Sequence, residues 1–420
     1  MKRVYFVESS VMGPAAIREA ARTLDLQVTF LSKITNQEGD ALRQLLSGRL
    51  LQCDTENHRT IEALIAMDTQ RGDLAGVMTL LDSRLNVVAK VCASLSVGGV
   101  DPAVACLKSK ANINVLVPEY VPQSIHIDVQ ADPYSKLADW MDQIEAETKA
   151  HGFVVKPSFA AGAKGLRLLP PDADVGDMTQ LMDAYLPAML KPYDLVVQVC
   201  MPGELVSLEG FVANGQVTYL GVTGRRKIGH TEALFIFPYD REIDPHALAR
   251  AQKAVVALVQ RAAFNNGFFH SEFIVCDRDA WLIDANFGRP GGANIAEILS
   301  LAYGLTLPDF YRLVIAISLY GAVPQDIRNR LDRPLPQEIW GAAYGLPDHS
   351  CLLDIQGLDC LRSRHTLAQN FGAMIDPMGS SNWAWVGLLA GTKDAVVSDL
   401  KQLRLHTSQG LVRPVCLMAS

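Results

Sequence analysis

The sequence lacks the features that mark several large classes of protein. None of its apolar runs approaches the roughly 20 uncharged residues that a membrane-spanning helix requires, and its N-terminus predicts a strand instead of a signal peptide. The formal net charge is -7 and no stretch is strongly basic, which argues against a nucleic-acid partner. We therefore expect a cytoplasmic protein that binds neither nucleic acid nor membrane.

Cysteine chemistry has little support either. The 8 cysteines form no CxxC pair, and no histidine cluster has the spacing of a zinc site. Most cysteines have apolar neighbours, which is typical of small buried side chains in a reducing compartment. A catalytic thiol would need a partner that the sequence does not indicate.

The composition is that of a folded protein with more than one core. Of the 420 residues, 49% are hydrophobic and 20% are charged. At roughly 100 to 200 residues per domain, this length predicts two to four lobes.

The first hundred residues alternate between strands and helices. Strands are expected at 2–7, 26–31, 50–53 and 75–80, and helices at 15–24, 39–46, 60–68 and 85–95. This alternation predicts a parallel sheet. The first turn has one glycine, Gly13, where a dinucleotide fingerprint has three, so a Rossmann cofactor site is not supported. Asp82 ends the last of these strands, where a ligand contact and a helix cap both account for it.

A lysine-containing hairpin follows in the middle of the chain. A short helix with Lys108 and Lys110, a strand-like segment at 115–121 and a helix at 135–149 precede it. In FVVKPSFAAGAKGLRLL, residues 153–169, two strands flank a loop of small residues, and Lys156 ends the first strand. Small residues let backbone N–H groups approach a phosphate while a lysine supplies charge. It is no Walker A loop, and an ordinary hairpin explains it too.

The next two segments could contact a nucleotide. In DLVVQVCMPGELVSLEGF, residues 194–211, Gln198 could offer an amide to adenine, Met201 could lie against the ring and Glu204 could accept from ribose. Ordinary strand residues at a bend are the alternative. After a strand at 216–222, GRRKIGH predicts an exposed basic turn, either a mobile loop that closes over anions or a solvated loop.

The most informative stretch is NGFFHSEFIVCDRDAWLIDANFGRPGG, residues 266–292. It predicts a hairpin with strands at 268–275 and 281–285. Glu272, Asp284 and Asn286 supply oxygen ligands of the kind that Mg²⁺ requires beside nucleotide phosphates. Arg289 and the glycine pair 291–292 suggest an adjacent anion site, although a surface hairpin with solvated carboxylates is also consistent.

The remaining chain contains no recognisable catalytic set. Helices are expected at 245–265, 293–302, 308–319 and 392–403, with short strands in GAAYGL and WAWVGLLAG. The polar, proline-punctuated segment 324–336 predicts a connection at a lobe boundary.

Taken in order, three segments resemble the ATP-grasp superfamily, specifically its carboxylate-amine ligases and most of all the amino-acid ligases that make dipeptides. The segments are VVKPSFAAGAKG, VVQVCMPGELVSLEGF and HSEFIVCDRDAWLIDANFGRPGG. The family reads approximately VVKP…GSGSKG, VQEYIPGEEYSVEGF and HxEF…LIEINPRxGG. GVMTLLDSRLNVVAKVCASL also resembles the family's N-terminal lobe, so the resemblance covers nearly the whole chain.

This resemblance implies an α/β (α+β) fold in three parts. A Rossmann-like parallel-sheet lobe at 1–100 precedes an ATP-grasp domain of two α+β subdomains at 101–325, with the lid at about 151–200. A small α+β lobe at 326–420 completes the chain.

The resemblance also implies roles for particular residues. The nucleotide-binding residues are Lys110 (with Lys108 as the alternative), Lys156, Ala161, Gly162, Lys164, Gly165, Gln198, Met201 and Glu204. The implied magnesium ligands are Glu272, Asp284 and Asn286. The implied catalytic residues are Arg289, Lys227 and His230.

Two departures from the family pattern affect these roles. Asp284 replaces the usual Glu and shortens the side chain by one methylene. NFGR replaces NPR, which places Arg289 one residue later, so its direction depends on whether a bulge restores it.

The implied function is an ADP-forming ligase that joins a small carboxylate, such as an amino acid, to an amine through an acyl phosphate. ATP and Mg²⁺ are the expected cofactors, with two metal ions and Mn²⁺ as an alternative, and a homodimer is compatible with this interpretation. Such phosphoryl transfer needs positioning and charge neutralisation, not a protein nucleophile. The alternatives are a carboxylase or formate-using transferase of the same superfamily and an ATP-binding protein without turnover.

Overall fold

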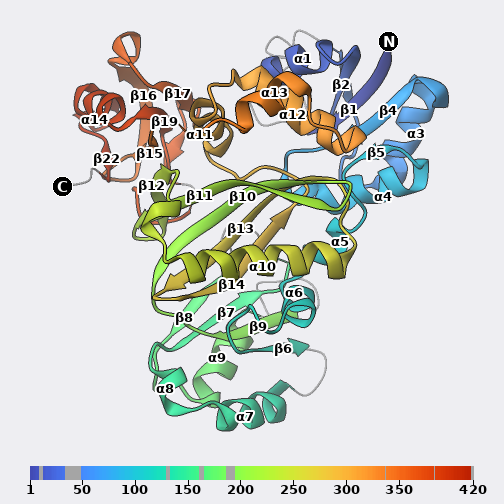
Figure 1. Cartoon of the computed structure of the whole chain (residues 1–420). Helices are drawn as coiled ribbons and strands as arrows, with labels where there is room; N and C mark the ends of the chain where they lie inside the picture. The colour runs from blue at the N-terminus through green and yellow to red at the C-terminus, as the bar shows by residue number, and fades with distance from the viewer. Residues whose placement is uncertain are drawn as a thin grey trace.

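The computed structural model describes residues 1–8, 13–33, 49–128, 133–159, 165–185, 194–335, 337–382 and 384–417. Their strands form four sheets (Figure 1). The helix expected at 39–46 lies outside the described residues, and so does most of the loop after Lys156.

The N-terminal lobe is the parallel sheet that the sequence predicts. Its strands β1 to β5 have the order β3-β2-β1-β4-β5 and pair in parallel. They are β1 (Lys2–Val7), β2 (Leu26–Ser32), β3 (Arg49–Gln52), β4 (Leu74–Met78) and β5 (Gly98–Gly99), with helices α1 (Pro14–Arg22), α3 (His58–Asp68) and α4 (Leu85–Leu95). The strand order reverses between β1 and β4, so their carboxyl ends form a topological switch point, where ligands of open α/β sheets commonly bind. Asp82 follows β4 at this switch point.

The second sheet is a small antiparallel sheet in the order β6-β9-β7-β8. Its elements are β6 (Ser124–Asp128), α7 (Pro133–Gln143), α8 (Ala146–Lys149), β7 (Phe153–Pro157), β8 (Arg167–Leu169), α9 (Val175–Tyr185) and β9 (Asp194–Val199). Apolar residues of α7 and α9 pack with the sheet and form a separate core. We call the four strands the lid sheet and the apolar cluster that they form with α7 and α9 the lid core. Figure 1 shows these elements in teal and green below the central strands.

Two expectations near the lid sheet are wrong. Residues 115–121 form no strand, because α6 (Lys110–Leu116), which follows α5 (Val104–Leu107), includes the first two of them. Ser109 caps α6, and Pro118 prevents its continuation. The single helix expected at 135–149 is interrupted between α7 and α8, where Ile144 is buried in the lid core.

The central sheet is antiparallel and joins two parts of the chain that are far apart in sequence. Its order is β14-β13-β10-β11-β12-β15-β19-β17, and β22 also pairs with β15. The first part is β10 (Glu204–Ala213), β11 (Gln216–Ile228), β12 (Thr231–Phe237), β13 (Gly267–Cys276) and β14 (Asp279–Phe287). The second part is β15 (Ile339–Gly345), β17 (Arg364–Leu367), β19 (Gly387–Thr392) and β22 (Val415–Cys416). Strands from both sides of residue 326 therefore share one sheet, and the predicted domain division there stays a prediction.

The basic segment GRRKIGH is not an exposed turn, as expected, but largely strand. β11 continues to Ile228 and pairs with β12, so the turn is reduced to Gly229 and His230. The strand persists because Arg225 is buried and ion-paired with Glu232 instead of hydrated.

The C-terminal part also contains a small sheet and further helices. The small sheet has the order β18-β16-β20-β21, formed by β16 (Ser350–Gln356), β18 (Met374–Ile375), β20 (Arg404–Thr407) and β21 (Gly410–Val412). The remaining helices are α10 (Pro245–Ala262), α11 (Ile295–Ala302), α12 (Leu307–Tyr320), α13 (Gln325–Leu331) and α14 (Lys393–Gln402). The segment expected to be a simple connection at 324–336 thus contains α13.

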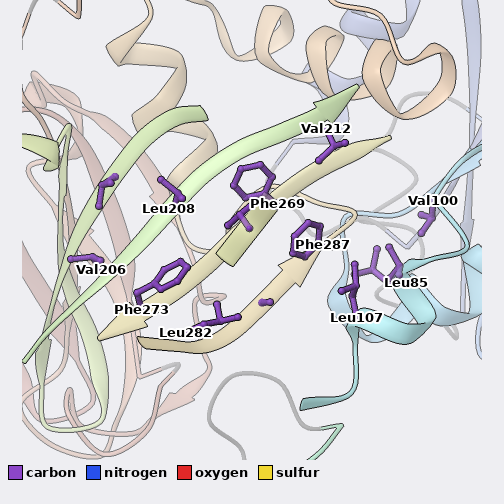
Figure 2. Close-up of a cluster of buried hydrophobic side chains, with 14 of the residues drawn as sticks. Leu85, Val100, Leu107, Val206, Leu208, Val212, Phe269, Phe273, Leu282 and Phe287 are labelled. Atoms are coloured by element: carbon purple, nitrogen blue, oxygen red, sulfur yellow. The ribbon is translucent and has the colours of Figure 1, made fainter. Parts of the chain in front are cut away.

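Helices cover both faces of the central sheet. On one face, α10 packs with alternate strand residues such as Phe269 and Phe273, and Leu85, Val100 and other N-terminal residues extend this core (Figure 2). On the other face, Phe268 packs with residues of α11 and α12. Within the described ranges no single helix is long and apolar enough to cross a membrane; α11 and α12 pass such a test only as a pair bent by 104°.

The cysteines are less buried than expected. All eight are free, but only Cys92 is buried and Cys360 is exposed. The prediction that most of them are buried is therefore wrong.

Gly203 connects the lid sheet to the central sheet, at a position where only glycine fits without strain. It lies between β9 and β10 with φ at +133°, and a Cβ there would lie 2.2 Å from the carbonyl oxygen of Val275. We predict that Gly203→Ala lowers the free energy of unfolding by about 3 kcal/mol, because the clash adds to backbone strain. Urea unfolding measures this change. Gly72→Ala is the control, since a Cβ at Gly72 meets nothing within 4 Å; equal stability of both variants would contradict the assignment.

Candidate functional site

The site is organised around the hairpin of β13 and β14. Antiparallel pairing places Glu272 directly opposite Asp284, and His270 opposite Asn286. The register shifts next to Glu272, so that Ile283 is an extra residue on β14. Because side chains alternate along a strand, His270 and Glu272 share the face opposite to Phe269 and Phe273. The three predicted metal ligands thus lie together on adjacent strands.

Lys156 connects the lid sheet to this hairpin. Its Nζ donates to the carbonyl oxygen of Ile283 at 2.9 Å and to Oε1 of Gln198, also at 2.9 Å. Both side chains are buried. Burial, with the nearby charge of Lys110, lowers the pKa of Lys156 from 10.5 to about 8. The predicted phosphate-binding lysine and the predicted adenine contact therefore meet beside the carboxylates.

Gln198 retains an unused hydrogen-bond donor. Its Nε2 is buried and has no partner among the described residues. An unpaired buried amide is unfavourable, so a ligand that offers an acceptor at this point would be stabilised. A purine ring has such acceptors, which makes the residue fit its predicted role.

Lys110 is a second lysine beside the hairpin. Its Nζ is 3.3 Å from Oδ1 of Asp284. Ser109 and Ser158 hold this lysine in place, because their hydroxyl groups are 3.0 Å apart and the backbone N–H of Lys110 donates to the carbonyl oxygen of Ser158 at 2.9 Å. Lys110, rather than Lys108, is therefore the lysine next to the predicted metal ligands.

Arg289 points toward the N-terminal lobe. Its guanidinium lies 3.3 Å from Oδ1 of Asp82, which also forms an ion pair with Lys108. The turn before it is made by Gly288, with φ at +93°, where a Cβ would lie 2.9 Å from Val104. Burial raises the pKa of Asp82, but Arg289 and Lys108 outweigh this effect and lower it. With the extra residue of NFGR, the arginine thus reaches Asp82 beyond the end of β4.

The predicted ribose contact lies at the start of β10. Glu204 is exposed and accepts a hydrogen bond from the Tyr239 hydroxyl at 3.0 Å. Met201 packs at the edge of the lid core. Both residues are close to Gly203, where the chain passes from one sheet to the other.

Glu272 belongs to a network of charged side chains whose other members, Arg225, His270, Glu209 and Glu232, are buried. Oε1 of Glu272 is 2.7 Å from Nη1 of Arg225 and 3.4 Å from Nε2 of His270. Arg225 also pairs with Glu232, and Nδ1 of His270 is 2.9 Å from both carboxylate oxygens of Glu209.

The pKa values in this network follow from its charges. Burial lowers the pKa of His270, but Glu209 and Glu272 more than offset this effect and raise it to about 9. Burial would raise the pKa of Glu272, yet Arg225 and His270 hold it well below its usual value. Glu272 is therefore an anion across the physiological range.

Sequence reasoning missed most of this network. It placed Arg225 in an exposed turn and assigned no role to His270, Glu209 or Glu232. The alternation of His270 with Glu272 on one strand was a signal that both face the site. A glutamate in the apolar strand VSLEGF was a second signal, since buried carboxylates are normally paired.

The remaining predicted residues lie at the edges of the site or outside the described residues. Lys227 and His230 are exposed near the end of the β11–β12 hairpin, beyond Arg225. Gly165 is described and has φ at +76°. Ala161, Gly162 and Lys164 lie outside the described residues.

The predicted oxygen ligands Glu272, Asp284 and Asn286 would suit a magnesium ion that is shared with a polyphosphate. Among the described residues, no group of three or more His, Cys, Asp or Glu side chains could hold a metal ion. Two carboxylates and one amide are what Mg²⁺ commonly takes from a protein when phosphate oxygens and waters complete its shell. Lys110 and Lys156, which contact the adjacent residues Asp284 and Ile283, can neutralise the phosphates.

Comparisons with known proteins identify similar structures. No family model matches the sequence, and no curated protein matches it. The structure is similar to an L-amino acid ligase from Bacillus licheniformis, with a TM-score of 0.74 and 17% identity over 96% of this chain and 98% of that chain. It is also similar to phosphoribosylglycinamide synthetase from Anaerococcus prevotii, with a TM-score of 0.71 and 15% identity over 96% and 99%.

A third similar structure was solved with ligands. It is the biotin carboxylase domain of the Hydrogenobacter thermophilus 2-oxoglutarate carboxylase, in complex with MgADP, ADP and bicarbonate. Its TM-score is 0.70 and its identity 13%, over 97% of this chain and 91% of that chain. At such identities these similarities establish the fold.

The lowered pKa of Lys156 predicts a pH dependence of ATP binding. Above pH 8 the lysine is neutral in the free protein, whereas ATP phosphates favour its charged form. ATP affinity should therefore weaken by about tenfold as the pH rises from ~7.5 to ~9.5, with proton uptake on binding. Calorimetric titration in buffers of different ionisation enthalpy measures both effects. In Lys156→Ala the pH dependence should disappear; if it persists, another group is responsible.

Proposed function

Because the chain has the ATP-grasp fold, we propose that it is an ATP-dependent ligase that joins a small carboxylate to an amine and releases ADP and phosphate. The observation that carries this proposal is the contact of Lys156 with Ile283, which brings a lysine of the lid sheet beside Glu272 and Asp284. A cation, two carboxylates and an amide at one point are suited to MgATP. The resemblance to amino-acid ligases favours an amino acid or a related metabolite as the acid.

Each residue has a role that follows from its position. Lys156 and Lys110 would bind phosphate oxygens, Gln198 would donate Nε2 to adenine, and Glu204 would accept from ribose hydroxyl groups. Ordering of these groups before ATP binds lowers the cost of positioning the γ-phosphate for attack by the substrate carboxylate.

The metal would be held by Glu272, Asp284 and Asn286. When bound, Mg²⁺ neutralises the charge that develops on the transferring phosphoryl group. Asp284 is one methylene shorter than the glutamate of the family. Lys110 lies 3.3 Å from Asp284, so this lysine would help to neutralise the ATP phosphates that the metal binds.

Arg289 would act at the carboxylate instead of at the nucleotide. Its contact with Asp82 places it at the carboxyl edge of the N-terminal sheet, beside Lys108. A cation there can stabilise an acyl phosphate and the oxyanion that forms when an amine attacks it. Lys227 and His230, at the exposed end of the β11–β12 hairpin, stay predicted catalytic residues.

Two alternatives remain distinct from this proposal. The fold is shared with a biotin carboxylase domain at a comparable TM-score, which keeps a carboxylase or a formate-using transferase as the second candidate. A nucleotide-binding protein without turnover is the third, since Asp284 and Arg289 depart from the family pattern.

Substrate dependence separates the three candidates. We expect phosphate release from ATP only when both an acid and an amine are supplied, because the acyl phosphate is consumed by the amine. A screen of acid and amine pairs with mass spectrometry of the product measures this. Dependence on bicarbonate or formate would support the second candidate, and tight ATP binding without phosphate release would support the third. AMP and pyrophosphate in place of ADP would contradict the mechanism.

The site assignment predicts the effect of two substitutions. Lys156→Ala and Glu272→Ala should each reduce turnover by at least about 100-fold, because they remove a phosphate contact and a metal ligand. Circular dichroism and thermal unfolding should show that both variants are folded. Near-normal turnover in either variant would remove that residue from the site.

A further inference from the structure

Two buried groups engage one carboxylate oxygen of Glu272. Nη1 of Arg225 and Nε2 of His270 both lie on Oε1, at 2.7 and 3.4 Å. The side chain is 20% exposed whereas those of Arg225 and His270 are 5% exposed. Oε1 is therefore engaged by buried groups, while part of the Glu272 side chain stays exposed.

The two groups on Oε1 are themselves fixed. Arg225 pairs through Nη2 with Glu232, whose side chain is 10% exposed. His270 is held by Glu209, which is buried and accepts from the hydroxyl groups of Ser207 at 2.8 Å and Thr223 at 3.2 Å. Rotation of Glu272 would break a buried ion pair, and a buried charge without its partner is costly.

We propose that Arg225 is a positioning residue that engages Oε1 of Glu272, leaves Oε2 as the single oxygen for a divalent ion, and keeps the ion from binding without nucleotide. This inference rests on the proposed function, in which Glu272 is a metal ligand. Two arguments support it, one from geometry and one from charge.

The geometric argument concerns coordination. A free carboxylate can bind a metal through both oxygens, but Mg²⁺ requires near-octahedral geometry and seldom accepts the narrow angle of a bidentate carboxylate. A carboxylate with one oxygen engaged presents one ligand in one direction. Groups behind the metal ligands commonly set orientation in this way, and we expect the loss of this orientation to reduce activity by about 10- to 100-fold.

The charge argument concerns the order of binding. Arg225 neutralises much of the charge of Glu272, and Lys110 does the same for Asp284. Two neutralised carboxylates attract a bare cation weakly. Phosphates supply the missing negative charge, so the ion binds well only together with the nucleotide.

Arg225→Gln tests the inference, with Mn²⁺ as the probe and electron paramagnetic resonance as the measurement. Without nucleotide, the dissociation constant of Mn²⁺ should decrease by about tenfold, because a positive charge beside Glu272 is lost. Turnover with saturating substrates and Mg²⁺ should fall by about 10- to 100-fold, because the carboxylate is free to rotate. Loss of a merely structural contact would not tighten metal binding. Unchanged or weaker Mn²⁺ binding would overturn the inference.

Two further variants test the charge argument and control for the loss of a buried ion pair elsewhere. Arg225→Lys keeps the charge but cannot span Glu232 and Glu272, so it should bind Mn²⁺ like the unmodified protein and still lose turnover; tighter binding in this variant would count against the charge argument. Arg3→Gln is the matched control, since Arg3 lies at the N-terminal end of β1 and is paired with the part-buried Asp68. It should change neither quantity.

Glu272→Ala distinguishes failure of this inference from failure of the proposed function. It should abolish Mn²⁺ binding in the presence of ADP. If it does and Arg225→Gln behaves like the unmodified protein, only the role of Arg225 is wrong. If Glu272→Ala binds Mn²⁺ normally, the metal site itself is wrong.

Discussion

The contact between a buried lysine and a strand carbonyl holds the two halves of the candidate site together. Lys156 belongs to the lid sheet, and Ile283 belongs to the central sheet. The carbonyl is accessible to the lysine because Ile283 is the extra residue of a bulge in β14. The same bulge lies between Glu272 and the apolar residues that follow it. The proposed nucleotide contacts and metal ligands thus depend on one irregularity in one hairpin.

Charge balance explains why so many ionisable groups can lie close together. The carboxylates that face the site each have a cation within ion-pair distance: Asp82 has Arg289 and Lys108, Asp284 has Lys110, and Glu272 has Arg225. Pairing offsets the cost of removing these groups from water. Under the proposed function, a polyphosphate with its metal would replace these existing pairs by exchange of partners.

The fold and the main part of the site were accessible from the sequence. Alternating strands and helices predicted the parallel sheet, and the resemblance of three motifs predicted the ATP-grasp fold, which the structural similarities confirm. The hairpin and its facing oxygens followed from alternation, because a period of two places Glu272 on one face irrespective of its distant neighbours. Two expectations, the basic turn at GRRKIGH and the strand at 115–121, were wrong. Arg225 lies in a strand because Glu232 and Glu272 pair with it, and Pro118 ends a helix that a cap at Ser109 begins.

Local pattern therefore determined which residue types face the hairpin surface, where most strands and helices occur, and which motifs belong together. Tertiary structure decided which of these groups meet. The bulge at Ile283 directs a carbonyl to Lys156, Gly288 turns Arg289 toward Asp82, and a buried network engages one oxygen of Glu272. These outcomes depend on residues separated by tens to hundreds of positions. Alternation and spacing describe only neighbours along the chain, so the pairing of charges was decided by packing alone.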